Sequence, residues 1–263
     1  MLERLSPPEQ AKLFSAYHAM NAVESGMKLG LGSGSTAAWL VRLLGARRQA
    51  EGLDISAAAT SRVTEDLAAQ VGIAISDIDG IGQLDLTIDG ADEFDPQLSL
   101  IKGGGGALLR EKIVATASDR MIVITDPSKE VAALGAYPLP VEVVRFGWQT
   151  TRRLVSDVLE RNGLGSAGIT LRQKGGETFV TDEGHVILDL SLGRIGDVDR
   201  LARELLNIAG VVETGLFIDI ADTVVIGAAS GEARMVYAAR EAQTVDLDDT
   251  ARLEALLAHL DWD

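Results

Sequence analysis

Short apolar runs alternate with helical patterns along the first half of the chain. The strand-like runs cover residues 27–32, 53–60, 84–89 and 121–126, and the helix-like stretches cover 13–20, 36–45, 61–72 and 107–117. We expect the first helix to end near Gly26 and the second at Gly45, because glycine favours helix ends. The run at 121–126 is almost entirely apolar, which is typical of a parallel strand buried on both faces. This alternation predicts a doubly wound, Rossmann-like α/β domain with a parallel sheet and right-handed connections.

The order of the elements changes after Leu134. From Pro138 the pattern becomes strand, helix, strand, strand, helix, strand, at 139–146, 150–163, 168–173, 178–192, 197–210 and 211–218, with a break in the fourth element at a DEG turn. This is the split βαβ order of ferredoxin-like domains. We therefore predict a smaller, inserted α+β ferredoxin-like domain at 137–209, and a Rossmann-like catalytic domain formed by 1–136 and 210–263.

Two more elements are predicted near the C-terminus. The apolar segment DTVVIGAA at 222–229 is expected to return to the first sheet. Leucines at 253, 256, 257 and 260 form a helical stripe behind N-cap candidates at Asp248 and Asp249. We expect this last helix to serve packing or a contact between subunits.

Composition excludes several classes of protein. The chain has 263 residues, is 46% hydrophobic, and has no apolar run near the roughly 20 residues of a membrane span. It contains no cysteine, so it can form no disulfide, and its N-terminus lacks the order of a signal peptide. A net charge of −15 without clustered Lys and Arg argues against nucleic-acid binding. We therefore expect a soluble, cytoplasmic protein without nucleic-acid or membrane partners, although a local positive pocket for a phosphorylated metabolite remains compatible with this charge.

A glycine-rich turn lies between the first strand and the second helix. The segment Gly30–Thr36 reads GLGSGST, and its position suits a turn that binds phosphate through helix-start amides. It matches neither a dinucleotide fingerprint, whose third glycine would stand at Ser35, nor a Walker loop, which needs a lysine before its Ser/Thr. Two interpretations remain: a small-anion cradle that includes Ser35 and Thr36, or a tight turn capped by serine.

Acidic residues follow the third predicted strand. Asp89 and Asp92 lie where open α/β sheets form their ligand crevices, and they can accept hydrogen bonds from sugar hydroxyls. With only three histidines in the chain, none of them near these acids, a zinc site is not expected, whereas an all-oxygen magnesium site stays open. A solvated turn is the competing interpretation, above all for Glu93 and Asp95.

Four glycines at 103–106 precede the helix that carries Glu111. Their backbone amides are unshielded by side chains, and Glu111 falls about one turn inside the helix, where a glutamate can act as a general base. Lys112 points elsewhere on this helix. Lys102 and Lys129 lie near strand ends on the same edge of the sheet, where together they favour recognition of an anion or a developing oxyanion.

These segments together resemble one family, ribose-5-phosphate isomerase of the A type. The resemblance extends to about residue 230 and is carried in order by GLGSGSTAAWL, TSRVTEDLAAQVGI, LDLTIDGADEFD, LIKGGGGALLREKIVA, TDPSKEV, PLPVEVV, VTDEGHVILDL and GVVETGLF. The family interconverts ribose 5-phosphate and ribulose 5-phosphate in the non-oxidative pentose phosphate pathway, and it uses neither a metal nor an organic cofactor. Its members are commonly dimers or tetramers, so the resemblance implies a homodimer or homotetramer.

The resemblance also implies a set of site residues. Glu111 falls on the catalytic base of the family, and Asp89, Asp92 and Lys102 are expected to assist it. The implied substrate site comprises Ser33, Gly34, Ser35, Thr36, Asp89, Gly90, Ala91, Asp92, Lys102, Gly103, Gly104, Gly105 and Lys129. The proton moves between C1 and C2 through an enediol or enediolate, so that one base and donors for the oxygen charge suffice. Lys12 from the opening helix is a weaker candidate for the phosphate.

Three alternatives remain open from the sequence. An acyl-CoA transferase or a sugar-phosphate deaminase of related fold would also place an acid near a glycine-rich turn. A non-enzymatic sugar-phosphate sensor would carry a basic DNA-binding helix pair, and none is seen in this acidic chain.

Overall fold

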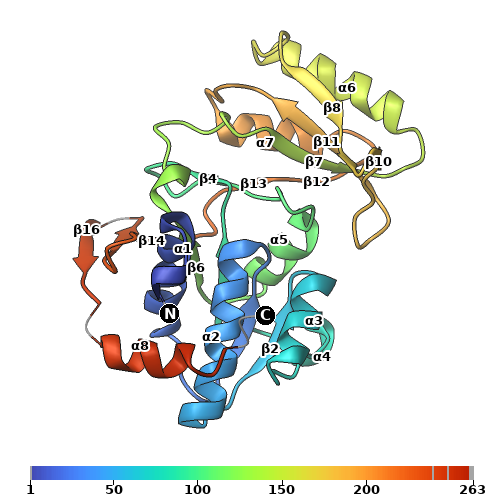
Figure 1. The fold of residues 1–263 in the computed structure, drawn as a ribbon. Coiled ribbons are helices and arrows are strands. Elements are labelled where there is room, and N and C mark those ends of the chain that lie inside the picture. The colour runs from blue at the N-terminus through green and yellow to red at the C-terminus, as the bar shows by residue number, and fades with distance from the viewer. Residues whose placement is uncertain (1, 239, 248, 261–263) are drawn as a thin grey trace. The chain divides into compact units, whose positions relative to one another are not determined.

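The computed structural model describes residues 2–238, 240–247 and 249–260, and the chain forms two compact units. The first unit consists of Met1–Gly90, Ile113–Lys129 and Ile220–Asp263, and the second of Ala91–Lys112 and Glu130–Asp219 (Figure 1). The predicted inserted domain at 137–209 lies within the second unit, which also takes residues on both sides of it. Each unit has its own hydrophobic core.

A seven-stranded sheet with the order β16-β15-β14-β6-β3-β1-β2 forms the centre of the first unit. Five of its strands are parallel: β1 (Lys28–Leu31), β2 (Ser56–Ala59), β3 (Leu86–Gly90), β6 (Met121–Thr125) and β14 (Thr223–Gly227). The doubly wound α/β class predicted from the sequence is therefore confirmed, including the return of 222–229 to this sheet. The antiparallel strands β15 (Ala233–Tyr237) and β16 (Arg240–Val245) extend the sheet at one edge and were not predicted; β16 is largely polar, and β15 is a run of only five residues.

The strand order creates a switch point in this sheet. The chain adds β2 on one side of β1, and then β3, β6 and β14 on the other side. Helices that follow neighbouring strands therefore leave in opposite directions between β1 and β3, which opens a crevice beyond the carboxyl ends of these two strands. The residues at these ends are the Gly32–Ser33 turn and Asp89–Gly90.

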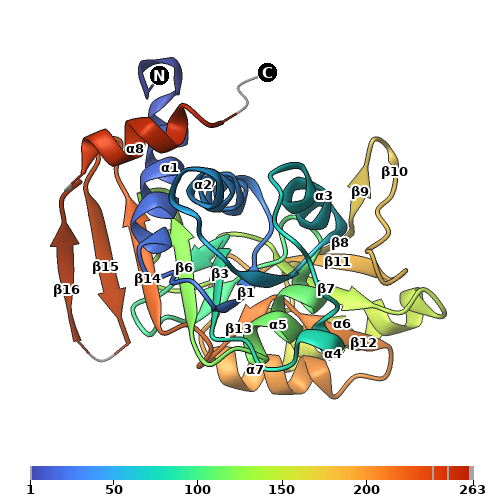
Figure 2. The same ribbon diagram turned by 90° about the horizontal axis from the view of Figure 1, so that it is seen from below.

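Helices cover both faces of this sheet. The first unit contains η1 (Leu2–Arg4), α1 (Pro7–Met20), α2 (Ser35–Glu51), α3 (Arg62–Gln70), α4 (Ile78–Ile81), η2 (Pro127–Lys129) and α8 (Thr250–Leu257). Figure 2 shows α1 and α2 on one face of the central strands, and these helices contribute 12 of the 28 buried residues of the large apolar core. Helix α1 ends at Met20, earlier than expected from Gly26. Helix α5 (Leu108–Thr116) is divided between the units after Lys112.

The prediction that the second helix stops at Gly45 is wrong. Helix α2 continues to Glu51 and ends at Gly52, which adopts a left-handed conformation with φ 72°. Gly45 stands inside the helix because α2 packs closely on the segment after α3. A Cβ atom at Gly45 would lie 2.5 Å from Cβ of Val71, which is closer than real Cβ atoms approach one another.

Helix α8 packs on the first unit. Leu253, Leu256 and Leu257 are fully buried in the same core as α1 and α2, and the Tyr17 hydroxyl donates to the carbonyl of Asp249. Asp249 caps the helix by accepting from the Arg252 amide, whereas the other cap candidate, Asp248, lies outside the described residues. On the helix surface, Arg252 donates to both carboxylate oxygens of Glu51, at 2.7 and 2.9 Å. The final helix is thus an integral part of the first unit.

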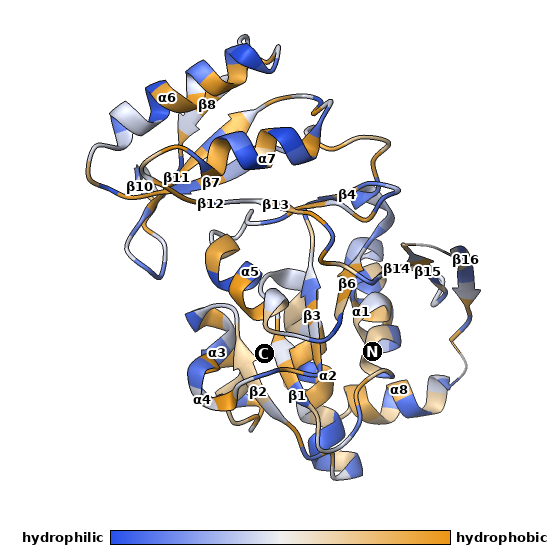
Figure 3. Ribbon diagram, turned by 180° about the vertical axis from the view of Figure 1, so that it is seen from behind, coloured by the Kyte–Doolittle hydropathy of each residue, from blue (hydrophilic) through white to orange (hydrophobic). Residues whose placement is uncertain are grey.

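The second unit contains a four-stranded antiparallel sheet with the order β12-β7-β11-β8. Its elements are β7 (Leu139–Val143), α6 (Trp148–Arg161), β8 (Gly168–Leu171), β11 (Val186–Ser191), α7 (Val198–Leu206) and β12 (Val211–Thr214). This is the ferredoxin-like order 4-1-3-2 that the sequence predicted. Figure 3 shows α6 and α7 with mixed orange and blue surfaces, and their apolar residues form the core together with one face of this sheet.

Shorter elements complete the second unit. The hairpin β9 (Gln173–Lys174) and β10 (Glu177–Thr178) follows β8, and the predicted break at the DEG turn separates β10 from β11. A three-stranded sheet has the order β13-β5-β4, with β4 (Glu93–Phe94), β5 (Leu100–Ile101) and β13 (Leu216–Phe217). Strand β5 leads directly into the glycine run. In the described part of the chain, no helix has the length and apolar character needed to cross a membrane.

Replacing Gly45 by alanine should destabilise the first unit by about 1–2 kcal/mol. Overpacking against Val71 costs about 1–3 kcal/mol, and the better helix propensity of alanine offsets part of it. The matched control is Gly80→Ala in α4, where no atom lies within 4 Å of the added Cβ. Urea unfolding should show this control to be neutral or slightly stabilised; equal effects in both variants would contradict the packing argument.

The contact between Glu51 and Arg252 should make stability depend on pH. The hydrogen bond from Arg252 lowers the pKa of Glu51 below its ordinary value of 4.5, against the opposing effect of burial. A lowered pKa means that this stabilisation is present above pH 4.5 and is lost as the pH falls through the folded-state value. Because the pair is partly exposed, Glu51→Gln should cost about 1 kcal/mol or less at pH 7.

The measurement is thermal unfolding of the wild type, E51Q, R252M and the double variant across this pH range. The difference between wild type and E51Q should shrink at acid pH, and the double variant should lose less than the sum of the singles. A difference that persists unchanged at low pH would exclude the ionised contact as its cause.

Candidate active site

The turn between β1 and α2 is built to receive an anion. Gly34 precedes the helix with φ 97° and ψ 177°, and the helix begins at Ser35. The first helical hydrogen bond runs from Ala38 to the Gly34 carbonyl, so that the preceding amides have no helical acceptor. Ser35 is exposed, Thr36 is half-buried, and the first turn contains no acidic residue. These groups provide amide and hydroxyl donors at the positive end of a 17-residue helix.

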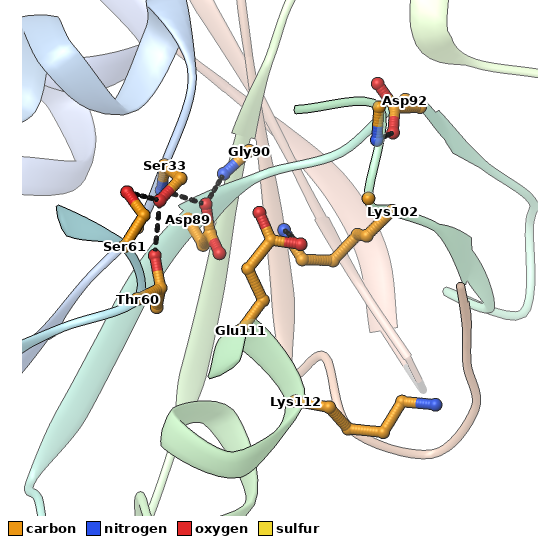
Figure 4. A network of polar contacts seen from close by, with 12 residues as sticks. Ser33, Thr60, Ser61, Asp89, Gly90, Asp92, Lys102, Glu111 and Lys112 are labelled. Atoms are coloured by element: carbon orange, nitrogen blue, oxygen red, sulfur yellow. Dashed lines mark hydrogen bonds and ion pairs between the residues drawn. The ribbon is translucent and has the colours of Figure 1, made fainter. Parts of the chain in front are cut away.

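Asp89 fixes the Gly32–Ser33 turn to the end of β3. Its side chain is fully buried, and Oδ1 accepts hydrogen bonds from the amides of Ser33, at 2.9 Å, and Gly90, at 2.7 Å (Figure 4). The switch point therefore brings together two residues that are 56 positions apart in the chain. A carboxylate held by two amides keeps one orientation.

A cluster of hydroxyls around Ser33 was not predicted. Ser33 Oγ lies 2.7 Å from Oγ1 of Thr60, 2.7 Å from Oγ of Ser61 and 3.1 Å from Oγ1 of Thr64 (Figure 4). Thr64 in turn donates to the Gly32 carbonyl at 2.9 Å. The Ser33 hydroxyl is thus committed to holding the turn. The three hydroxyl residues stand close together in the TSRVT segment after β2, which is visible in the sequence. Their contact with Ser33, however, depends on the pairing of β2 with β1.

Two lysines of the first unit differ in their surroundings. Lys129 ends η2, shortly after β6, so the strand order places it on the same edge of the sheet as the Ser35 turn. In the described residues no ion pair involves the Lys129 ammonium. Lys12, the weaker phosphate candidate, instead binds Glu9 at 2.6 Å. Glu9 also accepts from the Trp39 indole, so Lys12 belongs to a local surface network.

Glu111 and Lys102 form a buried pair in the second unit. Their side chains are only 5% and 2% exposed, and Lys102 Nζ lies 3.7 Å from Glu111 Oε2 (Figure 4). Lys102 follows β5, its amide donates to the Gly215 carbonyl, and its ammonium lies 5.4 Å from the ring centroid of Phe217. A carboxylate beside a fixed cation, both largely removed from water, can exchange protons with a bound substrate and stabilise negative charge that develops there.

The glycine run forms a tight loop beside this pair. Gly106 donates to the Gly103 carbonyl, and the Gly104 amide donates to Asp92 Oδ2 at 2.7 Å. A Cβ atom at Gly104 would lie 2.5 Å from Asp92 Oδ1 and 2.5 Å from the Tyr137 hydroxyl, so a side chain there would displace these two groups. The loop thereby links two of the predicted site residues, Asp92 and Gly104.

Several neighbouring charges are structural. Lys112 points away from Glu111 and donates to Glu213 and to the carbonyls of Thr214 and Leu216 (Figure 4). Burial lowers the pKa of Lys112, while Glu213 opposes that shift. Two further acids cap loops and are not in solvated turns as the competing interpretation had it: Glu93 accepts from the amides of Gly135 and Tyr137, and Asp95 from those of Gln97 and Ser99.

Two further residues near the glycine run escaped the sequence analysis. The Tyr137 hydroxyl lies against Gly104, and its pKa is raised by burial and by the charge of Asp92, which keeps the phenol neutral. Arg172 donates to the carbonyls of Gly103 and Gly104. Both lie far from the glycine run in sequence and share no motif with it.

The predicted site residues are thus distributed over both units. Ser33, Gly34, Ser35, Thr36, Asp89, Gly90 and Lys129 belong to the first unit, and Ala91, Asp92, Lys102, Gly103, Gly104, Gly105 and Glu111 to the second. Within the units the structure joins Ser33 to Asp89, Lys102 to Glu111 and Asp92 to Gly104. Among the described residues, no group of three or more His, Asp or Glu side chains is arranged to hold a metal ion.

Comparison with known proteins identifies the family. A family model described as ribose 5-phosphate isomerase A (phosphoriboisomerase A) matches residues 56–231. The chain belongs to the ribose-5-phosphate isomerase A family. Ribose-5-phosphate isomerase A of Dinoroseobacter shibae is 54% identical over 235 residues, covering 89% of this chain and 90% of that protein. The protein of the same name from Roseobacter denitrificans is 52% identical over 262 residues, covering 95% of this chain and all of that protein.

Solved isomerase structures share the fold. A D-ribose-5-phosphate isomerase in complex with phospho-erythronic acid has a TM-score of 0.78 and 33% identity, and the match covers 92% of this chain and 100% of that one. As a ribose-5-phosphate isomerase A, the chain interconverts ribose 5-phosphate and ribulose 5-phosphate in the pentose phosphate pathway. The transferase, deaminase and sensor alternatives are not favoured by these matches.

The Ser33 hydroxyl network predicts a specific stability effect. Ser33→Ala should destabilise the first unit by about 1–3 kcal/mol, because the buried Thr60, Ser61 and Thr64 lose a shared partner. Ser35→Ala, which removes an exposed hydroxyl at the next serine, should stay within about 0.5 kcal/mol of the wild type. Chemical denaturation measures both; a smaller loss for S33A than for S35A would show that the network contributes nothing.

Proposed function

We propose that Glu111 is the base that moves the proton between C1 and C2 of the sugar, with Lys102 as its electrostatic partner. The observation that carries this assignment is the 3.7 Å separation of the two charged groups in a site from which water is largely excluded. Coulomb interactions are stronger in such surroundings than in water. The cation beside Glu111 is therefore well suited to stabilise the enediolate as it forms.

The reaction then needs only proton movements. In the open-chain aldose, Glu111 takes the proton from C2, and the electron pair of that bond forms the enediolate as the C1 carbonyl oxygen gains negative charge. The same carboxylic acid returns the proton to C1, while the proton of the C2 hydroxyl passes to the oxygen on C1. The ketose results, and Glu111 is again a carboxylate. One carboxylate thus serves both half-reactions.

Asp89 and Asp92 are proposed to bind and orient the hydroxyl groups of the sugar. Main-chain amides fix both carboxylates, from Ser33 and Gly90 in one case and from Gly104 in the other. Fixed acceptors orient sugar hydroxyls at low entropic cost. Either carboxylate is suited to move the proton between O2 and O1 or to assist opening of the sugar ring.

The phosphate is proposed to bind at the start of α2. Ser35, Thr36 and the neighbouring amides supply donors, and Lys129 supplies a positive charge on the same sheet edge. A relative has been solved with a phosphorylated sugar acid, phospho-erythronic acid, which supports a place for a phosphate group in the site.

We also infer that the enzyme works as a homodimer or homotetramer in the cytoplasm. The resemblance to a family of commonly oligomeric enzymes supports the first statement, and a chain without cysteine is compatible with the second. Light scattering of the purified chain tests the oligomer, with a monomer as the contrary result. Cell fractionation tests the location.

Glu111→Gln should lower kcat for ribulose 5-phosphate formation by about a hundredfold or more, because the amide cannot accept the proton. The KM should change by less than about threefold, since glutamine keeps the shape of the side chain. Exchange of solvent deuterium into C1 or C2 should fall in parallel. The assay is run without added metal and with a chelator present, because the proposed steps use protons alone.

The matched control for Glu111→Gln is Glu204→Gln, which neutralises a partly exposed carboxylate on α7 of the second unit. Its turnover should equal that of the wild type. Near-normal turnover or deuterium exchange in E111Q would eliminate Glu111 as the base. Inhibition by the chelator that is reversed by magnesium would instead indicate a metal-assisted reaction.

A further inference from the structure

Arg172 is bound on both sides by groups that belong to the second unit. Its Nε and Nη2 donate to Asp189 Oδ2 and Oδ1 at 2.9 and 2.5 Å. Its Nη1 donates to the carbonyl oxygens of Gly103, at 2.7 Å, and Gly104, at 3.1 Å. The Arg172 side chain is only 13% exposed. The planar guanidinium thus connects one carboxylate to two successive peptide groups of the glycine run, a geometry that lysine cannot reproduce.

The four-stranded sheet holds this arginine in place. Leu188 and Leu190 of β11 belong to the core, so Asp189 between them faces the opposite side of the sheet. Arg172 follows β8, the neighbour of β11, and its amide donates to the Ile187 carbonyl. Pro140 of β7 lies on the same side and would contact a Cβ at Gly103, at 3.4 Å. The face that does not pack on the helices therefore supports the glycine loop.

The direction of the carbonyls determines where the amides point. All peptide bonds of the described chain are trans, so each carbonyl is antiparallel to the N–H of the next residue. The Gly103 and Gly104 carbonyls face Arg172, and the amides of Gly104 and Gly105 are consequently directed to the other side of the loop. The Gly104 amide meets Asp92 there, and Gly105 is exposed, with nothing within 4 Å of an added Cβ atom. A positive charge on the carbonyl side also polarises these peptide groups and strengthens their N–H donors.

We propose that Arg172, held by Asp189, is a positioning residue for the isomerisation: it orients and polarises the Gly104 amide, which fixes Asp92, and the Gly105 amide, which stabilises the enediolate. This inference rests on the proposed reaction, in which an enediolate forms beside Glu111 and Lys102. Arg172 itself need not touch the sugar. Its contribution is made in the transition state, because the charge that the Gly105 amide stabilises develops only there.

The test compares Arg172→Met with the matched control Arg200→Met, which breaks an exposed Arg–Glu pair on α7 of the same unit. R172M should lower kcat by about 10- to 100-fold, near the lower end of the effect of losing an oxyanion donor. The KM should stay within about threefold of the wild type. The inhibition constant of phospho-erythronic acid, whose planar anionic carboxylate resembles the enediolate, should rise by about the same factor as kcat falls.

Two milder variants keep the test decisive if R172M does not fold. Arg172→Lys retains the positive charge but lacks the planar guanidinium with its several donors. Asp189→Asn retains the arginine but replaces its carboxylate partner by a neutral amide. Both variants should show kcat between R172M and the wild type. Circular dichroism and thermal unfolding establish that each variant is folded. A merely structural role would change stability without a parallel loss of kcat and of affinity for the inhibitor.

Several outcomes would overturn the inference. They are a wild-type kcat in R172M or in both milder variants, a raised KM with unchanged kcat, or a lowered kcat with unchanged inhibitor affinity. E111Q is assayed beside these variants to separate the two proposals. An inactive E111Q with a normal R172M rejects only the role of Arg172, whereas an active E111Q rejects the base whatever Arg172 does.

Discussion

Hydrogen bonds from main-chain amides to carboxylates fix the loops on which the site depends. Within the seven residues from Asp89 to Asp95, four acids each accept from backbone N–H groups. Apart from that of Gly90 at the end of β3, these amides lie outside helices and strands, and leaving them unpaired in buried positions would cost about 1–3 kcal/mol each. The acids therefore define the loop conformations before any of them acts on a substrate. Asp89 and Asp92 combine this structural function with a position at the proposed reacting centre.

The buried Lys102–Glu111 pair, unlike these amide–carboxylate bonds, does not contribute to the stability of the fold. Removing two charges from water costs several kcal/mol per ion, and mutual attraction recovers this cost only with good geometry. At 3.7 Å the contact is longer than a strong charged hydrogen bond. Such a pair is better explained by reactivity than by stability. The surrounding structure, in particular the capped loops and the two apolar cores, must supply the stability that this pair does not.

Local sequence patterns predicted the elements but not the contacts between them. Hydrophobic periodicity was sufficient for the doubly wound sheet and for the split βαβ order, because long elements bury a repeating face. Gly45 does not mark a helix end, because what requires glycine there is the close approach of Val71. Strands β4 and β5 have two residues each, which is too short for any periodicity.

In the proposed site, too, the sequence predicts residues of one motif but not the contacts between distant segments. Residues that stand in one motif, such as Asp89 and Asp92 or the glycine run, can be recognised together. Thr60, Ser61 and Thr64 became part of the site only through the pairing of β1 with β2, and Arg172 acts on a carbonyl 68 residues away. Nothing in the local sequence distinguishes this arginine from a solvated one. The roles assigned to these residues follow from tertiary contacts, which a single sequence does not contain.

The neighbouring residue Lys112 sets the direction of Glu111. Successive residues of an α-helix are rotated by about 100°, so fixing one side chain fixes the direction of the next. Lys112 is held by three acceptors, namely Glu213 and the carbonyls of Thr214 and Leu216, and its ammonium also lies 4.8 Å from the ring centroid of Phe217. Phe217 is in turn 5.4 Å from the Lys102 ammonium. One aromatic ring thus lies against both lysines, and the rotation of α5 that satisfies Lys112 is the one that directs Glu111 toward Lys102.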